Sequence, residues 1–207
     1  MVDPVPDHDA PLLESTADPD PFEQFGRWFA DAADVVRVPE SVAIATADLE
    51  GRPSARMVLM KGWDREGFIF HTNYESRKSH ELAENPWAAM LFYWEPLGRQ
   101  IRIEGRVARA TASESDEYFA TRPRGAQIGA LASRQSRPIE SREALDRKVR
   151  ALTEERAGSP VGRPAWWGGF RLTPDVFEFW QNRGDRLHDR LRYLPEGERW
   201  HMDRLQP

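Results

Sequence analysis

Four short segments of the chain combine basic side chains with residues that could bind an anion. In the first, Arg56 and Lys61 stand at the two ends of an apolar stretch with the composition of a strand. Their positions differ by an odd number, so on a regular strand their side chains point to opposite faces. A common site would need a bulge, the end of the strand or a subunit interface to bring them together. Charged strand ends that face water are the simpler alternative.

The second segment, Ser76–Lys78, falls where we expect a helix to begin, and it places Arg77 next to Lys78. Adjacent cations disfavour a helix N-terminus, where the macrodipole already supplies positive charge. They become favourable if an anion binds there, because the free backbone N–H groups bind it as well. Solvated side chains are the alternative for this segment taken alone.

The third segment, Arg122–Gly125, follows an expected helix that carries Tyr118, and Gln135–Ser136 comes soon after it. Two guanidinium groups can bind phosphate bidentately. Tyr118 lies four residues before Arg122, so the two share a face if the helix continues. The amide and hydroxyl groups at 135 and 136 suit a phosphate or the edge of a heterocycle. A polar loop without function would have a similar composition.

The fourth segment begins at Trp180–Gln181 and continues to Arg186–Arg190, which contains His188. Two arginines and a histidine near a tryptophan suit a planar, anionic substrate, whereas a basic surface strand is the alternative. No pair of histidines has the spacing of metal ligands, so we expect no metal. The chain also lacks a Walker loop and a G-x-G-x-x-G motif, so side chains would have to hold any phosphate.

The composition limits the partners of these segments. The net charge of -5 gives no general attraction for nucleic acid or an anionic membrane. The absence of cysteine excludes disulfides, thiolate nucleophiles and Cys-ligated metal centres. No apolar stretch approaches the length of a membrane span and no signal pattern is present, so we expect a cytoplasmic protein. A phosphate in a partly desolvated site needs several cations, and the candidates are Arg56, Lys61, Arg77, Lys78, Arg122, Arg186 and Arg190.

The elements that position these groups are expected to form one domain over residues 20–207, after a disordered tail over residues 1–19. Asp20 predicts the start of a first helix, with Pro21 at its first position and Glu23 completing a capping box. Shorter helices are expected from Ser76 to before Pro86, at 114–121, and at 142–156. The last of these has an apolar stripe of Leu145, Val149 and Leu152.

Strands are expected at 41–47, 55–61, 67–72, 87–94 and 99–110, and later at 169–172, 176–180 and about 200–205. They are rich in Val, Ile, Phe and Met, and turn-forming residues separate the early ones. Closely spaced strands of this kind indicate an antiparallel sheet that closes into a barrel. The predicted fold class is therefore α+β, with one barrel and peripheral helices.

The sequence motifs of this chain, in their order from the N-terminus, resemble those of the pyridoxine/pyridoxamine 5'-phosphate oxidase family. The resemblance covers about residue 22 to the C-terminus, and the Arg186–Arg190 segment is its most specific part. The other matching motifs are Arg56–Lys61, Thr72–Asn73, Ser76–Lys78, Arg99–Gln100, Arg122–Gly125, Gln127–Gly129, Gln135–Ser136, Trp167–Gly169 and Glu178–Gln181.

The resemblance implies a Greek-key, FMN-binding split β-barrel whose homodimer forms two FMN sites at its interface. Lys61, Tyr118 and Arg122 would hold the substrate phosphate. Arg186 and His188 would be the catalytic residues that hold the pyridine ring over the flavin. The residues implied as FMN contacts are Arg56, Met57, Val58, Leu59, Met60, Lys61, His71, Thr72, Arg77, Lys78, Gln100, Gln135, Ser136, Trp180 and Arg190.

The implied reaction is the oxidation of pyridoxamine and pyridoxine 5'-phosphates to pyridoxal 5'-phosphate. A hydride would pass from the C4' carbon to FMN, and O2 would become H2O2. A related flavin oxidase of the phenazine-biosynthesis type and a non-catalytic binder of FMN or pyridoxal phosphate are the alternatives. Lys61 and Arg122 favour a phosphorylated substrate.

Three positions depart from the family pattern. Ala126 stands where many members have a Ser that contacts the substrate phosphate, so one hydrogen bond is missing. Leu131 replaces a frequent Trp. Asn182 replaces a frequent Gly, which is tolerable because Asn adopts positive φ more readily than most residues.

Overall fold

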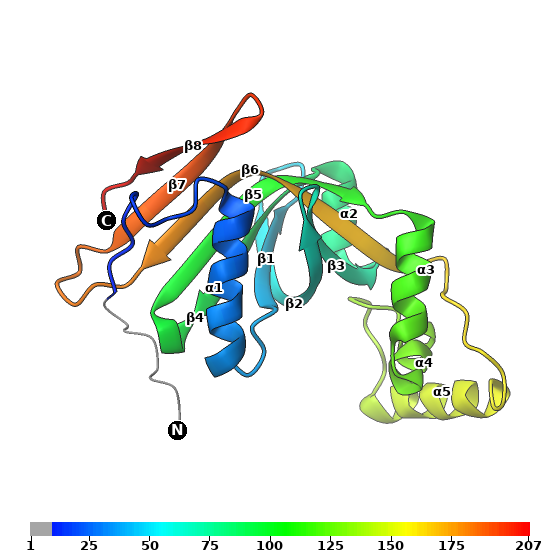
Figure 1. The fold of residues 1–207 in the computed structure, drawn as a ribbon. Helices are drawn as coiled ribbons and strands as arrows, with labels where there is room; N and C mark the ends of the chain where they lie inside the picture. Colours follow the sequence, from blue (N-terminus) through cyan, green and yellow to red (C-terminus); the bar gives the residue numbers. More distant parts are fainter. Residues whose placement is uncertain (1–9) are drawn as a thin grey trace, which may run out of the picture.

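The computed structural model describes residues 10–207 as one antiparallel sheet with helices around it (Figure 1). The strand order is β3-β2-β1-β4-β5-β6-β7-β8, and β3 also pairs with β6, so the first six strands of this order close into a barrel. The α+β barrel predicted from the sequence is therefore confirmed. The strands are β1 (Ser41–Ala47), β2 (Pro53–Asp64), β3 (Gly67–Asn73), β4 (Trp87–Trp94), β5 (Arg99–Arg109), β6 (Trp167–Gln181), β7 (Asp189–Glu196) and β8 (Arg199–Arg204).

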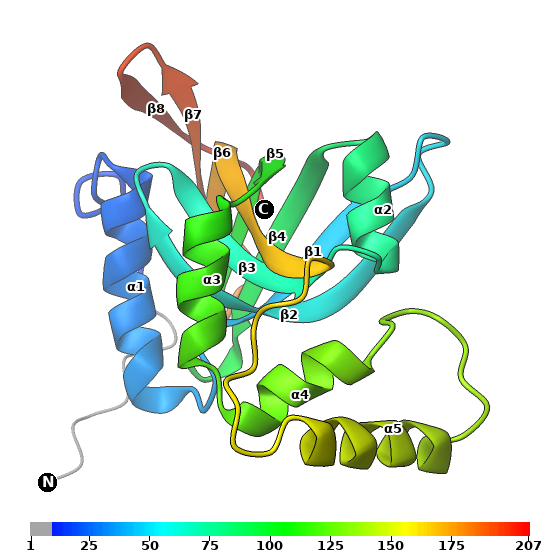
Figure 2. The same cartoon turned by 90° about the vertical axis from the view of Figure 1, so that its right-hand side faces the viewer.

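Aromatic side chains fill the barrel. Many of them come from the strand positions that point inward, which alternate with positions that point outward. Phe25, from the first helix, packs its ring 4.9 Å from that of Phe68 and 5.3 Å from that of Phe92. A second, smaller cluster around Phe119 and Trp167 lies outside the barrel, among the helices after β5. Figure 2 shows these helices beside the barrel. The helices are α1 (Pro21–Val35), α2 (Arg77–Glu84), α3 (Ala112–Thr121), α4 (Arg124–Ala132) and α5 (Arg142–Glu155), with a short 3-10 helix η1 (Glu95–Leu97).

Two predicted helix starts are confirmed in position but not in every contact. Asp20 is the N-cap of α1, and its carboxylate accepts from the N–H of Phe22. The carboxylate of Glu23 pairs with Arg65 instead of completing a capping box. Ser76 is the N-cap of α2, but its hydroxyl bonds to the side chains of Ser79 and Lys78 rather than to the helix backbone. Ser76 therefore helps to place Lys78.

The second half of the chain differs more from expectation. The predicted strands at 169–172 and 176–180 are one strand, β6, and the register of its pairing with β5 shifts next to Pro174. A bulge accommodates a proline that cannot donate a ladder hydrogen bond. Gly105, paired with Pro174, has no room for a Cβ, which would lie 2.0 Å from the Thr173 oxygen. Helix α4 and strand β7 were not predicted.

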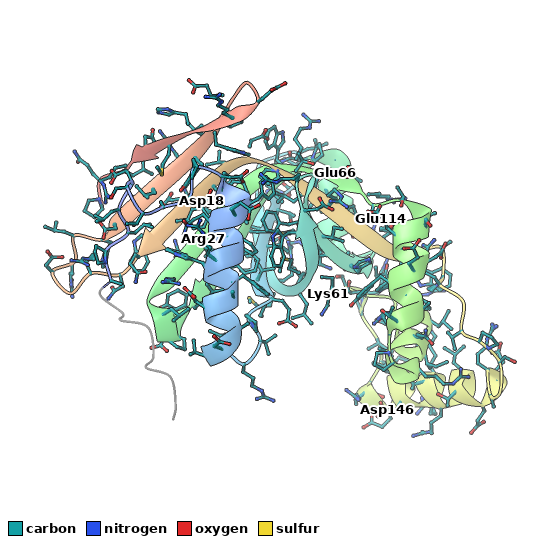
Figure 3. All side chains as sticks on the ribbon, viewed as in Figure 1. Asp18, Arg27, Lys61, Glu66, Glu114 and Asp146 are labelled. Carbon is teal, nitrogen blue, oxygen red and sulfur yellow. The ribbon has the colours of Figure 1, made fainter. Side chains whose placement is uncertain are left out.

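The N-terminal segment is ordered over more residues than expected. Residues 10–19 were assigned to a disordered tail, but the structure places them against β7 and β8. Leu12 is buried, its N–H donates to Asp189 at 3.2 Å, and the Asp18 oxygen accepts from the Tyr193 hydroxyl at 2.8 Å. Figure 3 shows Asp18 near Arg27 of α1, with which it forms an ion pair of 2.6 Å. Residues 1–9 lie outside the described part of the chain.

Candidate active site

A cavity of about 810 Å³ lies between the outer side of the barrel and the helices that follow β5. Strand β2, strand β3 and the start of α2 form one side of it, and α3, α4 and the loop after α4 form the other. Figure 3 shows Lys61 on the side of the barrel that faces α3. The lining residues are Ser54, Ala55, Arg56, Met57, Val58, Leu59, Lys61, His71, Thr72, Asn73, Arg77, Lys78, Tyr118, Arg122, Ala126, Gly129, Ala130, Ser133, Gln135, Ser136 and Trp167.

Arg56 and Lys61 of β2 line the same cavity, and a bulge lies at Lys61. The register with β3 pairs Met60 with Phe70 and Gly62 with Ile69, so Lys61 is the extra residue. An extra residue reverses the alternation of side chains beyond it. Consecutive residues from Ser54 to Leu59 line the cavity together with Lys61, so residues of both parities in one strand contribute to it. Met60 is 3% exposed in the barrel core, so its side chain, unlike those of its neighbours, does not line the cavity.

Five cationic side chains line the cavity, and among the described residues no Asp or Glu side chain does. Lys78 is one of them, and it is almost fully buried. Its ammonium donates to Thr72 at 2.7 Å and to Ser76 and Gln135 at 3.0 Å. Burial, together with the nearby charge of Arg56, lowers the pKa of Lys78 to about 8. Two nearby carboxylates, those of Glu81 and Glu40, pair with three of the five cations, and the remaining excess of positive charge favours an anionic ligand.

The cations form two groups. Arg56 and Arg77 lie with Lys78 near the start of α2, whereas Lys61 and Arg122 lie around His71. The second group also contains aromatic rings. His71 stacks on Tyr118 with ring centroids 4.0 Å apart, and the Arg122 guanidinium lies 4.5 Å from the Trp167 ring.

Several polar atoms of this second group have no partner in the described part of the chain. They are both ring nitrogens of His71 and the Nη1 atom of Arg122. Burial first, and then the charges of Arg122 and Lys61, lowers the pKa of His71 to about 4, so the imidazole is neutral near pH 7. Buried polar groups normally have hydrogen-bond partners. These orphan groups therefore fit a site that a ligand completes.

The remaining predicted site residues lie at the far end of β6. Gln100 of β5 pairs with Trp180, which pairs with Arg190 of β7. The His188 ring is 4.6 Å from that of Trp180, and its Nδ1 accepts from the Arg183 N–H at 3.1 Å. None of Gln100, Trp180, Arg186, His188 and Arg190 lines the cavity.

The two groups of predicted site residues are too far apart to form one site in one chain. Trp167 of the cavity and Trp180 of the other group stand near opposite ends of β6, a strand of 15 residues. At about 3.3 Å per residue their separation along the strand is roughly 40 Å. Figure 1 shows α3 near the beginning of β6 and the loop to β7 at its other end.

Backbone strain occurs both among the residues that line the cavity and among the predicted site residues at the far end of β6. Ser136 and Arg186 have φ values of 69° and 64°, and they are the non-glycine residues with positive φ in the described part of the chain. Such strain persists where the surrounding structure requires it, often at functional sites. Asn182 has no positive φ, so the expected reason for tolerating Asn there was wrong. Its N–H instead donates to the Gly98 oxygen at 2.8 Å.

Comparisons with known proteins show the family of this chain. A family model described as pyridoxamine 5'-phosphate oxidase matches residues 30–156. The chain belongs to the pyridoxamine 5'-phosphate oxidase family. A second model, described as the pyridoxine 5'-phosphate oxidase C-terminal dimerisation region, matches residues 167–207. The family recognised from the sequence motifs is thus confirmed.

Related proteins support the assignment over almost the whole chain. Pyridoxine/pyridoxamine 5'-phosphate oxidases of Rubrobacter xylanophilus and Bordetella petrii are each 55% identical to it, covering 96% and 95% of this chain and 92% and 93% of theirs. Among solved structures, PhzG from Burkholderia lata 383, in complex with tetrahydrophenazine-1-carboxylic acid, superposes with a TM-score of 0.88. It is 37% identical and covers 97% of this chain and 100% of its own.

A more distant structure shares only the fold. It is a pyridoxamine 5'-phosphate oxidase-related, FMN binding protein from Nostoc punctiforme, with a TM-score of 0.73 and 16% identity over 90% of this chain and 98% of its own. The chain is thus an oxidoreductase of an FMN-binding family, and its cation-lined cavity has the charge that a phosphate-bearing cofactor requires. No helix in residues 10–207 is long and apolar enough to cross a membrane.

Sequence reasoning missed some residues of the site. Asn73 and Trp167 lie within recognised motifs but received no role, and both line the cavity. Glu81 was also missed, although it stands four residues after Arg77 on a predicted helix. That spacing favours an ion pair on one helix face, and the structure contains it, with 2.8 Å between Arg77 Nε and Glu81 Oε1.

Proposed function

We propose that this oxidase converts pyridoxamine and pyridoxine 5'-phosphates to pyridoxal 5'-phosphate, with FMN as cofactor and O2 as the electron acceptor that becomes H2O2. The observation that carries the proposal is the cavity with five cations and no lining carboxylate in the described chain. An acidic protein that concentrates positive charge in this way is suited to ligands of high negative charge. Relatives at 55% identity are named for these two substrates.

The two groups of cations fit two phosphates. FMN and the substrate each carry one phosphate, with about -1.5 to -2 charge near neutral pH. Arg56, Arg77 and Lys78 would bind the FMN phosphate together with the hydroxyl of Ser136. Lys61, Tyr118 and Arg122 would bind the substrate phosphate, and the unpartnered Nη1 of Arg122 would gain an acceptor.

The protein's part in the reaction is to hold the substrate in place and to exclude water. Bound FMN would supply the redox chemistry, accepting a hydride from the substrate C4' carbon and passing the electrons to O2. Arg186 and His188 would orient the pyridine ring, as the family resemblance implies. Neither residue lines the cavity of its own chain, so we propose that a second copy of the chain provides them. The match of residues 167–207 to a dimerisation region supports a homodimer.

The similarity to PhzG supports a second candidate, an oxidase of the phenazine-biosynthesis type. Lys61, Tyr118 and Arg122 argue against it, because a carboxylated tricyclic substrate does not require a separate phosphate site. A non-catalytic FMN or pyridoxal phosphate binder is the remaining alternative.

Oxygen uptake by the purified, FMN-loaded protein tests the proposal. We expect uptake, H2O2 and pyridoxal 5'-phosphate with both phosphorylated vitamers, and far less with pyridoxine and pyridoxamine. Faster uptake with reduced phenazine carboxylic acids would instead favour the PhzG-like function. An FMN-loaded protein that consumes no oxygen with any of these compounds would indicate a binding protein.

A further inference from the structure

Glu81 of α2 is a buried carboxylate that lies behind the cations of the cavity without lining it. The residue is 5% exposed. Its Oε2 atom accepts hydrogen bonds from the hydroxyls of Thr46 at 2.5 Å and Ser54 at 2.6 Å. The same oxygen lies 3.3 Å from Nη2 of Arg56, and Oε1 accepts from Nε of Arg77 at 2.8 Å. Glu81 thus joins α2 to β1 and β2.

These contacts fix Arg56 in a single orientation. Its Nη1 donates to the Thr46 hydroxyl at 2.6 Å and to the Ile44 oxygen at 3.2 Å, and its Nη2 donates to the Ser54 hydroxyl. Thr46 and Ser54 in turn donate to Glu81. The carboxylate is therefore the common acceptor of a network that surrounds one guanidinium.

Arg77 depends on Glu81 still more directly. Its side chain is 63% exposed, and the bond from Nε to Glu81 is the ion pair that restrains it. Because this bond uses Nε, both terminal nitrogens stay available for a ligand. Without Glu81, this long exposed side chain would lose more rotamer freedom when it binds a ligand, which weakens binding.

Because Glu81 is negatively charged, it cannot help to bind an anion by direct electrostatic attraction. Burial raises the pKa of this carboxyl, but the hydrogen bonds from Ser54, Thr46 and Arg77 and the charge of Arg56 outweigh it, so the pKa is about 2. The carboxylate is thus ionised at neutral pH and repels a phosphate. Its contribution to binding an anion must come from ordering the cations.

We propose that Glu81 is a positioning residue that holds Arg56 and Arg77 in the orientation that binds the FMN phosphate. The inference rests on the proposed function, because it takes FMN as the ligand of this group of cations. It assigns no direct contact between Glu81 and FMN.

Binding of FMN and of riboflavin, followed by quenching of flavin fluorescence in the apoprotein, tests this role. Riboflavin lacks the phosphate, so it reports the rest of the flavin site. In Glu81→Gln, which keeps the size of the side chain, we expect the Kd for FMN to rise on the order of tenfold while riboflavin binding stays unchanged. Glu81→Asp should give a smaller loss, because its shorter carboxylate can still reach one arginine.

A double-mutant cycle identifies the residue through which Glu81 acts. Glu81→Gln should weaken FMN binding much less in an Arg77→Ala background than in the wild type, because the side chain that Glu81 orders is already gone. Asp64→Asn is the matched control. Asp64 pairs with Arg171 at 2.5 Å at the end of β2, the strand that carries Arg56, and it does not line the cavity. Its replacement should leave both flavin affinities unchanged.

Three outcomes would overturn the inference. If Glu81→Gln weakened the binding of FMN and of riboflavin equally, Glu81 would only maintain the fold around the cavity. Tighter FMN binding in Glu81→Gln would show that the carboxylate acts only by repulsion. A wild-type apoprotein that binds neither flavin would refute the proposed function itself, and the inference with it.

Discussion

At the scale of single residues, burial controls the chemistry of His71. The imidazole stacks against the rings of Tyr118 and Trp167, and both of its nitrogens lack partners in the described chain. Its pKa falls from 6.5 to about 4. Between these two pH values the unfolded chain binds a proton that the folded chain does not, so His71 makes the folded state less stable as the pH falls from 6.5 to 4.

Replacing His71 with Phe should therefore stabilise the protein. The ring stacking remains, whereas the unsatisfied nitrogens are removed, and we expect a gain of about 1–2 kcal/mol at pH 7.5. The gain should be larger at pH 5, where the wild type has lost the stability linked to His71. Thermal unfolding of the apoprotein at one fixed protein concentration measures both values. His201→Gln, an exposed change on β8, is the control. A less stable His71→Phe would show that the nitrogens are bonded after all.

Ala126 is a second residue whose effect is local. It lines the cavity together with Arg122, where a hydroxyl could reach the substrate phosphate. A hydrogen bond to a charged group contributes about 1.5–3 kcal/mol. Ala126→Ser should therefore lower the KM for pyridoxine 5'-phosphate on the order of tenfold and leave kcat nearly unchanged. Unphosphorylated pyridoxine is the internal control, and an equal improvement with it would contradict the assignment.

At the scale of elements, α3 carries Tyr118 and begins with a capping box. The Thr111 hydroxyl accepts from the Glu114 N–H, and the Glu114 carboxylate accepts from the Thr111 N–H. Glu114 also pairs with Arg171 of β6 at 2.8 Å, so the cap attaches the helix to the barrel. The position of Tyr118 in the cavity therefore depends on the start of its helix.

Thr111→Ala tests this dependence. Loss of an N-cap costs about 0.5–2 kcal/mol, and the looser helix should raise the KM for the phosphorylated substrate without changing the affinity for FMN. Thr121→Ala is the matched control at the other end of α3, where the hydroxyl only donates to the Tyr118 oxygen. Equal effects of the two changes on KM would contradict a special role for the cap.

At the scale of the whole molecule, the separation of the two groups of site residues along β6 requires a second chain if both serve one reaction. Arg122 lines the cavity near the beginning of β6, and Arg186 lies in the loop that follows the other end of this strand. Arg122→Ala and Arg186→Ala should each inactivate a homodimer. Arg186→Ala should nevertheless keep FMN, since the cation group at α2 is intact.

Mixing the two variants should restore activity. After they are unfolded and refolded together, half of the dimers are heterodimers, and each has one site with both arginines. The mixture should then reach about a quarter of the wild-type activity. Separately refolded samples, combined afterwards without subunit exchange, provide the control. A mixture that stays inactive would show that Arg122 and Arg186 act within one chain.

Much of this architecture could be predicted from local patterns. The strands at 41–47 and 87–94 were predicted with their observed bounds because alternating burial leaves a clear signature in the sequence. Helix α4 was missed because its helical signal is weak: Arg124, Gly125 and Gly129 disfavour a continuous apolar face. Its helix forms because Ile128 and Ala130 are buried against neighbouring helices and Trp167. Strand β7 did carry an alternating signal at Leu191 and Tyr193, both fully buried, but it was overlooked.

The sequence by itself determined which groups are available for chemistry: the cations, the aromatic residues that accompany them and the strands that carry them. Only the tertiary structure decided how they are combined. The bulge at Lys61, the network around Glu81 and the distance between Arg122 and Arg186 all depend on pairings between residues far apart in the chain. Such pairings follow from the register of whole strands and from burial, which no local pattern of residues specifies.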